Sequence, residues 1–298
     1  MPCLFVTSSV SLMNNDQSWK AATVYIHPIS RLFRSLELKG ARARFFVTPG
    51  GIKITSTAQS KTYTAQLYID SSAFASYQID NYDESDFQTT VSIDALVHCL
   101  QMFVKWSADD TKGSTTESAL QTNQTGSSAC FIEFIPNKQL QLKYASESMN
   151  SICHLTLYEN DEFTSELKFD SEQVILQAIM PSAVLVNVFK DMAAVSSKEM
   201  TISSSVSPMR VTFNSSGDLV STEFSLPNDP KVVEALSIDV ESDFTYDFGS
   251  IIQSMNGIRT ATKISLRYDV YGTLSIQCLC AVDEHEVYIE YKFLPKQI

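Results

Sequence analysis

The sequence has no long apolar runs and no paired cysteines, the features that mark membrane proteins and disulfide- or zinc-held proteins. No apolar stretch among the 298 residues reaches the length of a membrane span. The six cysteines form no Cys-x-x-Cys pair and do not crowd into one segment, which argues against a zinc ribbon or a disulfide framework. Most of them lie in apolar runs, as free thiols do in a reducing compartment. Residues 1–13 lack a basic flank, so we expect no signal peptide.

Basic charge is also scarce. Lys and Arg number 22 against 34 Asp and Glu, which gives a net charge of −12. A domain that binds nucleic acid usually carries a basic footprint. If this chain meets DNA, its cations must therefore gather on one face while the acids lie elsewhere. Hydrophobic residues make up 44% of the chain, enough to form folded cores rather than a disordered chain.

Motifs for catalysis are missing as well. The sequence has no Walker loop, no Gly-x-Ser-x-Gly and no His-Glu-x-x-His. The histidines, at positions 27, 98, 154 and 285, show no ligand spacing. His98 and Cys99 are neighbours on a predicted helix, and neighbouring helical residues do not share a face, so we expect a packed Cys99 and a surface His98. The acidic runs 80–86 and 283–286 are typical of solvated loops. We therefore predict no catalytic residue, no metal site and no cofactor.

Apolar periodicity predicts one rhythm, strand–helix–strands–helix–strands, in each of two halves. In the first half we expect strands at 21–26, 44–47, 52–57, 62–69, 130–135, 139–144 and 152–158, with helices at 28–38 and 93–104. In the second half we expect strands at 174–180, 200–204, 210–213, 220–226, 263–269, 273–282 and 286–293, with helices at 181–195 and 248–259. The pattern predicts an α+β protein with mostly antiparallel sheets.

Two polar stretches punctuate this rhythm. Residues 107–128 are rich in Ser, Thr, Gln and Asn and predict a flexible loop. Residues 159–170 are acidic and predict a linker between the halves. We therefore divide the chain into a variable N-terminus (1–18), a first domain (19–158), the linker (159–170) and a second domain (171–298).

Every predicted helix, or its exit, carries a base away from its apolar stripe. These candidate phosphate-binding residues are Arg31, Arg34, Lys105, Lys190, Arg259 and Lys263. The acids concentrate instead at 80–86, 159–172 and 239–247, which we expect to be loops and the linker. Two interpretations stay open: a helical surface that attracts DNA phosphates without reading sequence, or ordinary solubility residues on amphipathic helices.

Several segments resemble the proliferating-cell-nuclear-antigen-like clamps. Residues 51–55 (GIKIT) match a strand that follows the first helix of such clamps. Residues 178–183 (AIMPSA) are similar to the start of a clamp's second domain, and residues 289–296 (IEYKFLPK) are similar to its closing strand.

Within that superfamily, two further segments resemble the radiation-checkpoint subunit of the nine-one-one clamp. They are residues 91–103 (VSIDALVHCLQMF) and 261–277 (ATKISLRYDVYGTLSIQ). The resemblance extends over residues 19–295, and the order of the motifs carries more weight than any one of them.

The resemblance implies a DNA clamp fold of two similar domains, each with antiparallel sheets outside and two helices lining a channel. It also implies a ring of three different subunits that a clamp loader places around double-stranded DNA in the nucleus. Such a ring recruits checkpoint and repair proteins and has no membrane role.

Neighbouring subunits in such a ring pair through edge strands, and here the resemblance points to residues 152–158 and 220–226. The implied interface residues are Ile152, His154, Thr156 and Tyr158 in the first half, and Val220, Thr222, Phe224 and Leu226 in the second. Ordinary edge strands are the alternative interpretation.

Three other functions stay open at this point. A homotrimeric replicative clamp would need the two edges to pair with each other. A 3'-5' exonuclease would need a cluster of acids at metal-binding distances. A generic α+β interaction protein would form no ring.

Overall fold

The computed structural model describes residues 18–38, 41–80, 87–112, 128–135, 139–158, 166–217 and 220–296. The first half contains β1 (Ser18–Thr23), α1 (Ile26–Arg34), β2 (Arg42–Thr48), β3 (Gly51–Thr57), β4 (Tyr63–Asp70), η1 (Ser71–Ala73), β5 (Ser76–Asp80), β6 (Phe87–Ser92), α2 (Ile93–Lys112), β7 (Ala129–Ile135), β8 (Gln139–Ala145) and β9 (Asn150–Leu155). The second half contains β10 (Val174–Pro181), α3 (Ser182–Ala194), β11 (Glu199–Val206), β12 (Met209–Ser216), β13 (Ser221–Pro227), β14 (Ala235–Ile238), β15 (Ser242–Asp247), α4 (Phe248–Ile251), η2 (Ile252–Ser254), α5 (Met255–Thr260), β16 (Lys263–Asp269), β17 (Leu274–Val282) and β18 (His285–Phe293).

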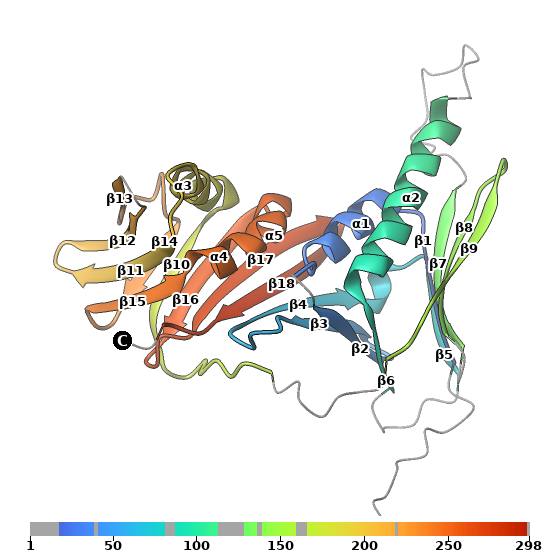
Figure 1. Ribbon diagram of the computed structural model, residues 1–298, viewed down its shortest axis with the longest axis horizontal. Helices are drawn as coiled ribbons and strands as arrows, with labels where there is room; N and C mark the ends of the chain where they lie inside the picture. Colours follow the sequence, from blue (N-terminus) through green and yellow to red (C-terminus); the bar gives the residue numbers. More distant parts are fainter. Residues whose placement is uncertain are drawn as a thin grey trace, which may run out of the picture.

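Three antiparallel sheets build the molecule (Figure 1). A nine-stranded sheet, in the order β14-β10-β16-β17-β18-β4-β3-β2-β6, runs through both halves. The halves join where β18 pairs with β4, from Tyr288 opposite Tyr68 to Phe293 opposite Tyr63. A five-stranded sheet (β5-β1-β7-β8-β9) belongs to the first half and a four-stranded sheet (β13-β12-β11-β15) to the second. The predicted α+β class with antiparallel sheets is confirmed.

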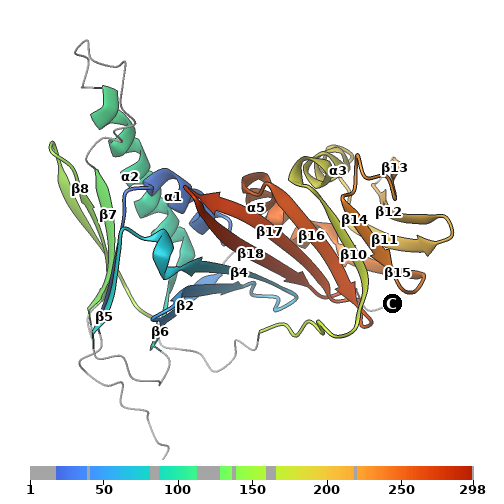
Figure 2. The same cartoon turned by 180° about the vertical axis from the view of Figure 1, so that it is seen from behind.

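The helices share one side of the nine-stranded sheet, as Figures 1 and 2 show from opposite directions. Each helix buries an apolar stripe: Ile29, Leu32 and Phe33 in α1, Leu96, Val97 and Leu100 in α2, and Leu185, Phe189 and Met192 in α3. Fully burying one such side chain contributes about 1.5–3 kcal/mol. The stripes therefore fix which face of each helix is left for solvent or a ligand.

The helices approach the sheet closely at α5. A Cβ atom added to Gly257 would lie 2.1 Å from the Tyr291 hydroxyl oxygen of β18. The same hydroxyl donates a 2.8 Å hydrogen bond to the Ser35 carbonyl oxygen at the end of α1. Gly257 thus lets α5 lie against the strand that joins the two halves.

Several predicted boundaries were wrong. Helix α1 begins at Ile26 rather than Pro28, and α2 continues to Lys112, so its last turns occupy the start of the expected 107–128 loop. Residues 113–127 of that loop lie outside the described residues. The expected helix 248–259 is divided into α4, η2 and α5. The Ser254 hydroxyl donates a 2.6 Å hydrogen bond to the Ile251 carbonyl oxygen at this break, a contact that competes with helical hydrogen bonding.

Strands β5, β6, β14 and β15 were not predicted from the sequence. β15 occupies most of the acidic stretch 239–247 that was expected to be a loop. Tyr246 is buried there, and its hydroxyl donates a 2.8 Å hydrogen bond to the Gly272 carbonyl oxygen. Apart from Tyr246 and Phe244, this strand consists of two aspartates, a serine and a threonine, so composition alone concealed it.

The predicted domain division stays a prediction. Of the expected linker, residues 159–165 lie outside the described residues, and residues 166–170 form no helix or strand. In the part of the chain that is described, no helix has the length and apolar character of a membrane span.

Candidate nucleic-acid interface and subunit edges

Helix α1 presents Arg31 and Arg34 on its exposed side, opposite its buried stripe. Both lie in the last helical turn, where cations interact favourably with the negative end of the helix dipole. Because α1 packs against both α2 and α5, the two guanidinium groups lie where the two halves of the molecule meet.

Three other predicted cations lie on the same side of the sheet. Lys105 of α2, Lys190 of α3 and Arg259 in the last turn of α5 are exposed. Within the described part of the chain, none of these three side chains forms an ion pair with a carboxylate. The structure therefore brings five of the six predicted residues to one helical surface.

The helices differ in net charge from the rest of the chain. The helical segments α1, α2, α3, α4, η2 and α5 hold six Lys or Arg and four Asp, so 6 − 4 = +2. The rest of the chain then carries −12 − 2 = −14. A mildly positive helical surface on a negative body favours a polyanion on the helical side.

Lys263 does not share this surface. It is the first residue of β16 and not part of a helix. Leu266 of β16 pairs with Ile276 of β17, which pairs with Tyr291 of β18, so these three side chains share one face of the sheet. That face is the helical one, because the Tyr291 hydroxyl contacts the end of α1. Side chains alternate along a strand and Lys263 is three residues from Leu266, so Lys263 points to the face away from the helices. Its ammonium group forms a 2.7 Å ion pair with Glu234.

The two predicted interface strands both lie at sheet edges. β9 ends the five-stranded sheet and β13 ends the four-stranded sheet. Figure 1 shows them at opposite ends of the long axis of the molecule. Among the described strands, none pairs with the outer side of either edge, and such unpaired backbone N–H and C=O groups are a template for pairing with another chain.

The edge at β9 is shorter than predicted. The strand ends at Leu155, so Thr156 lies beyond it. Tyr158 turns away: its N–H donates a 2.8 Å hydrogen bond to the Thr90 carbonyl oxygen of β6. The Arg42 guanidinium lies 4.1 Å from the Tyr158 ring centroid. Tyr158 therefore covers the edge of the nine-stranded sheet instead of extending β9.

The predicted residues on the two edges also point to different sides. Ile152 and His154 are exposed on the outer face of β9, whereas Cys153 and Leu155 face inward. On β13 the predicted set faces inward: Phe224 lies opposite Phe213 and Leu226 opposite Val211. Val220 precedes the strand and is half exposed. The outward side chains of β13 were missed, although strand alternation could have identified them.

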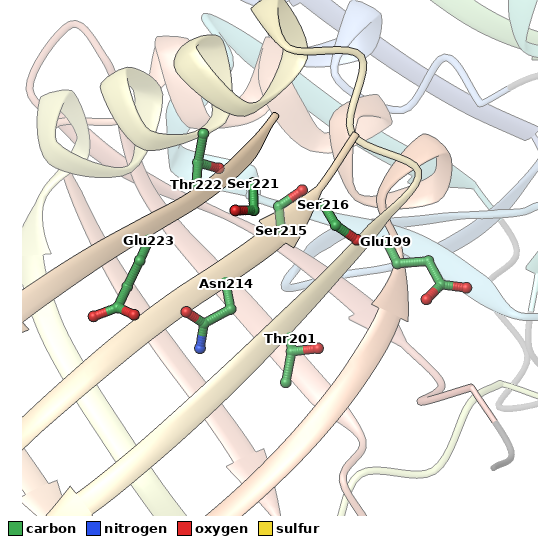
Figure 3. Close-up of a pocket in the computed structure, with 8 residues that line it drawn as sticks. All are labelled: Glu199, Thr201, Asn214, Ser215, Ser216, Ser221, Thr222 and Glu223. Atoms are coloured by element: carbon green, nitrogen blue, oxygen red, sulfur yellow. The ribbon is translucent and has the colours of Figure 1, made fainter. Parts of the chain in front are cut away.

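A polar depression of about 340 Å³ lies beside the β13 edge (Figure 3). Its lining residues are Glu199, Thr201, Asn214, Ser215, Ser216, Ser221, Thr222 and Glu223. A second depression, of about 320 Å³, lies between the C-terminal tail and the start of α4.

Among the described residues, no group of three or more His, Cys, Asp or Glu side chains is arranged to hold a metal ion.

The neighbouring His98 and Cys99 are arranged as expected. His98 is exposed, and its Nδ1 lies 2.8 Å from the Asp94 carbonyl oxygen. Cys99 is partly buried and contacts Cys153 of β9. Burial, together with the hydrogen bond to that thiol, raises the pKa of Cys99 to about 12. A thiol with this pKa is almost wholly protonated at neutral pH, and only the thiolate is a strong nucleophile.

Comparison with known proteins identifies the family. A model of the repair-protein family Rad1/Rec1/Rad17 matches residues 18–280 of this chain. The chain belongs to this Rad1 family. It is 23% identical over 278 residues to the mouse cell cycle checkpoint protein RAD1, and the aligned region covers 91% of this chain and 90% of the mouse protein. It is 22% identical over 298 residues to the human protein of the same name, covering 100% of this chain and 98% of the human one.

A fission-yeast relative extends the comparison. The DNA damage checkpoint control protein rad1 of Schizosaccharomyces pombe is 21% identical over 276 residues, covering 89% of this chain and 82% of the yeast protein. The Rad1 match confirms both the resemblance found in the sequence and the predicted clamp fold. The predicted roles of individual residues stay predictions.

Proposed function

We propose that this Rad1-family chain is a non-catalytic subunit of a heterotrimeric checkpoint clamp. The ring is loaded onto DNA at sites of damage and recruits checkpoint signalling and repair factors. The names of the mouse, human and fission-yeast relatives, all checkpoint proteins, support this function. It further implies that the chain works in the nucleus with a clamp loader.

One observation carries the proposal: among the described residues, the edge strands β9 and β13 lie at opposite ends of the molecule, and the helices share one side of the nine-stranded sheet. Strand addition between β13 of one subunit and β9 of the next would propagate around a closed ring. In such a ring the helical surface of every subunit would face the same space. The sheets would then form the outer wall, which carries the negative charge of this chain.

The helical surface supports a sequence-independent grip on the DNA backbone. Arg31, Arg34, Lys105, Lys190 and Arg259 are long, flexible cations placed where they can contact phosphates, and phosphate contacts carry no base information. A surface with a net charge of only +2 favours weak contacts that break and re-form, as sliding requires. We leave Lys263 out of this set because it lies on the opposite face of the sheet.

Mass in solution tests the proposal. The purified chain is measured alone and after co-expression with the two other subunits of the checkpoint clamp. We expect a monomer alone and a complex of one copy of each subunit after co-expression. A stable homotrimer of the chain alone would instead indicate a replicative clamp. Divalent-metal-dependent digestion of DNA by the pure chain would indicate an exonuclease.

A further inference from the structure

The edge strand β13 has two chemically different faces. Its inward side chains are Thr222, Phe224 and Leu226, and its outward side chains are Ser221, Glu223 and Ser225. An added strand would have to match an apolar inner face and a polar outer face at once. The outer face is the more selective of the two because it carries a charge.

Glu223 lies at the end of a polar row. Thr201 of β11 lies opposite Asn214 of β12, and Asn214 lies opposite Glu223. Figure 3 shows these three side chains together along the depression. The eight lining residues include two carboxylates and no Lys or Arg.

The two carboxylates differ in their surroundings. Glu199 is already paired with Lys296 of the C-terminal tail. Glu223 is exposed and, among the described residues, forms no ion pair. Glu223 is therefore the charge that the outer face of β13 offers to an incoming chain.

The inner face of the same edge is also incomplete. The Thr222 hydroxyl oxygen is buried and has no hydrogen-bond partner in the described part of the chain. Ser215 of β12, which lies directly opposite Thr222, is 7% exposed, and its hydroxyl oxygen also has no hydrogen-bond partner in the described part of the chain. Buried hydroxyls are normally paired, so this edge has the chemistry of a surface that another chain completes.

The close spacing of side chains on paired strands limits which residue type can lie opposite Glu223. Directly opposed side chains on neighbouring strands have Cβ atoms about 4.5–5.5 Å apart; opposite charges at that distance stabilise the pair and like charges destabilise it. The outward side chains of this chain's own β9 are Asn150, Ile152 and His154, with no Lys or Arg among them. The best match for Glu223 therefore comes from a different polypeptide.

We propose that β13 selects a partner subunit whose edge strand places a lysine or arginine opposite Glu223, with the cationic head in the depression beside Asn214. The inference rests on the proposed clamp function, and it adds what distinguishes the correct neighbour at this edge from a second copy of the chain. Glu223 is a selectivity residue of the interface, not of DNA binding.

The test uses the full chain with the purified clamp subunit that pairs at this edge, by titration calorimetry at low and high salt. We expect Glu223→Gln to weaken association about 2- to 5-fold and Glu223→Lys to weaken it about 10-fold, since repulsion replaces attraction. Asp243→Asn is the matched control. Asp243 is an exposed carboxylate on the same outer face, but on the opposite edge strand β15, where it lies beside Ser203. We expect this variant to bind like the wild type.

The outcomes separate the two proposals. If the wild-type chain binds no clamp subunit, the proposed function is overturned. If it binds but both Glu223 variants bind equally well, the clamp function stands and the selectivity proposal is overturned. A wild-type homotrimer that Glu223→Gln weakens would assign the neighbour to a second copy and also overturn it. Unchanged thermal unfolding of the Glu223 variants excludes misfolding as the cause of weaker binding.

Discussion

Replacing Arg31 and Arg34 together with alanine should flatten the salt dependence of DNA binding by the assembled clamp. Each phosphate that a cation neutralises releases counterions and steepens the plot of log affinity against log salt by about 0.9. Five cations on the helical surface of this chain would contribute a slope of about −4.5, and the double variant would reduce that to about −2.7.

These slopes predict a measurable difference. Between 50 and 200 mM salt, the contribution of this chain to affinity would fall about 500-fold in the wild type and about 40-fold in the double variant. The assay is fluorescence anisotropy of a labelled duplex at several potassium chloride concentrations, with the complete heterotrimer. The other subunits contribute equally to both measurements, so the difference in slope belongs to this chain.

Lys263→Ala is the matched control for this prediction. Lys263 lies on the sheet face opposite the helices and is paired with Glu234 at 2.7 Å, so its removal should leave the slope unchanged. The reasoning is refuted if the arginine double variant keeps the wild-type slope. It is refuted as well if Lys263→Ala lowers the slope as much as the loss of one helical arginine.

Three further predictions concern the fold. Gly257→Ala would place a Cβ atom 2.1 Å from the Tyr291 hydroxyl oxygen, and we expect a loss of about 1–3 kcal/mol in urea unfolding; an unchanged midpoint would contradict the close approach. Burial raises the pKa of Cys130 and Cys280 to about 12 from an unfolded value of 9.0. The unfolding free energy should therefore be steady below pH 9 and fall as pH rises toward 12, because only the unfolded state releases these thiol protons in that range. Urea titrations at pH 8 and pH 10.5 measure the difference, and equal unfolding free energies at the two pH values would contradict it. Asp247 accepts a 2.7 Å hydrogen bond from the Ser250 N–H at the start of α4, so Asp247→Ala should cost about 1 kcal/mol and lower the thermal midpoint, whereas no shift would show that the cap is dispensable.

The sequence predicted long, strongly periodic elements well. The stripe Leu96–Val97–Leu100 located α2, and the stripe Leu185–Phe189–Met192 located α3, because one face of each helix must be apolar to pack on a sheet. The break at η2 could not be predicted in the same way. It depends on a Ser254 contact with the Ile251 carbonyl oxygen that competes with the helical pattern only once the segment is folded.

The candidate surfaces were predicted in kind but not in orientation. Five of the six cations share the helical side, while Lys263 lies on the other side because strand alternation in β16 turns its side chain away from the helices. Both edge strands were located, yet the outward face of β13, with Glu223, was missed. Strand alternation separates the polar set Ser221, Glu223 and Ser225 from Phe224 and Leu226, so the sequence pattern could have placed Glu223 on the outward face.

Retention on circular DNA tests the central claim most directly. The heterotrimer containing this chain is loaded by its clamp loader onto circular duplex DNA that carries one single-stranded gap, and the circle is then cut once with a restriction enzyme. A ring that encircles DNA remains on the circle after a high-salt wash and slides off after linearisation, which is the predicted result. Equal retention before and after cutting, or loss from both forms in high salt, would contradict the account.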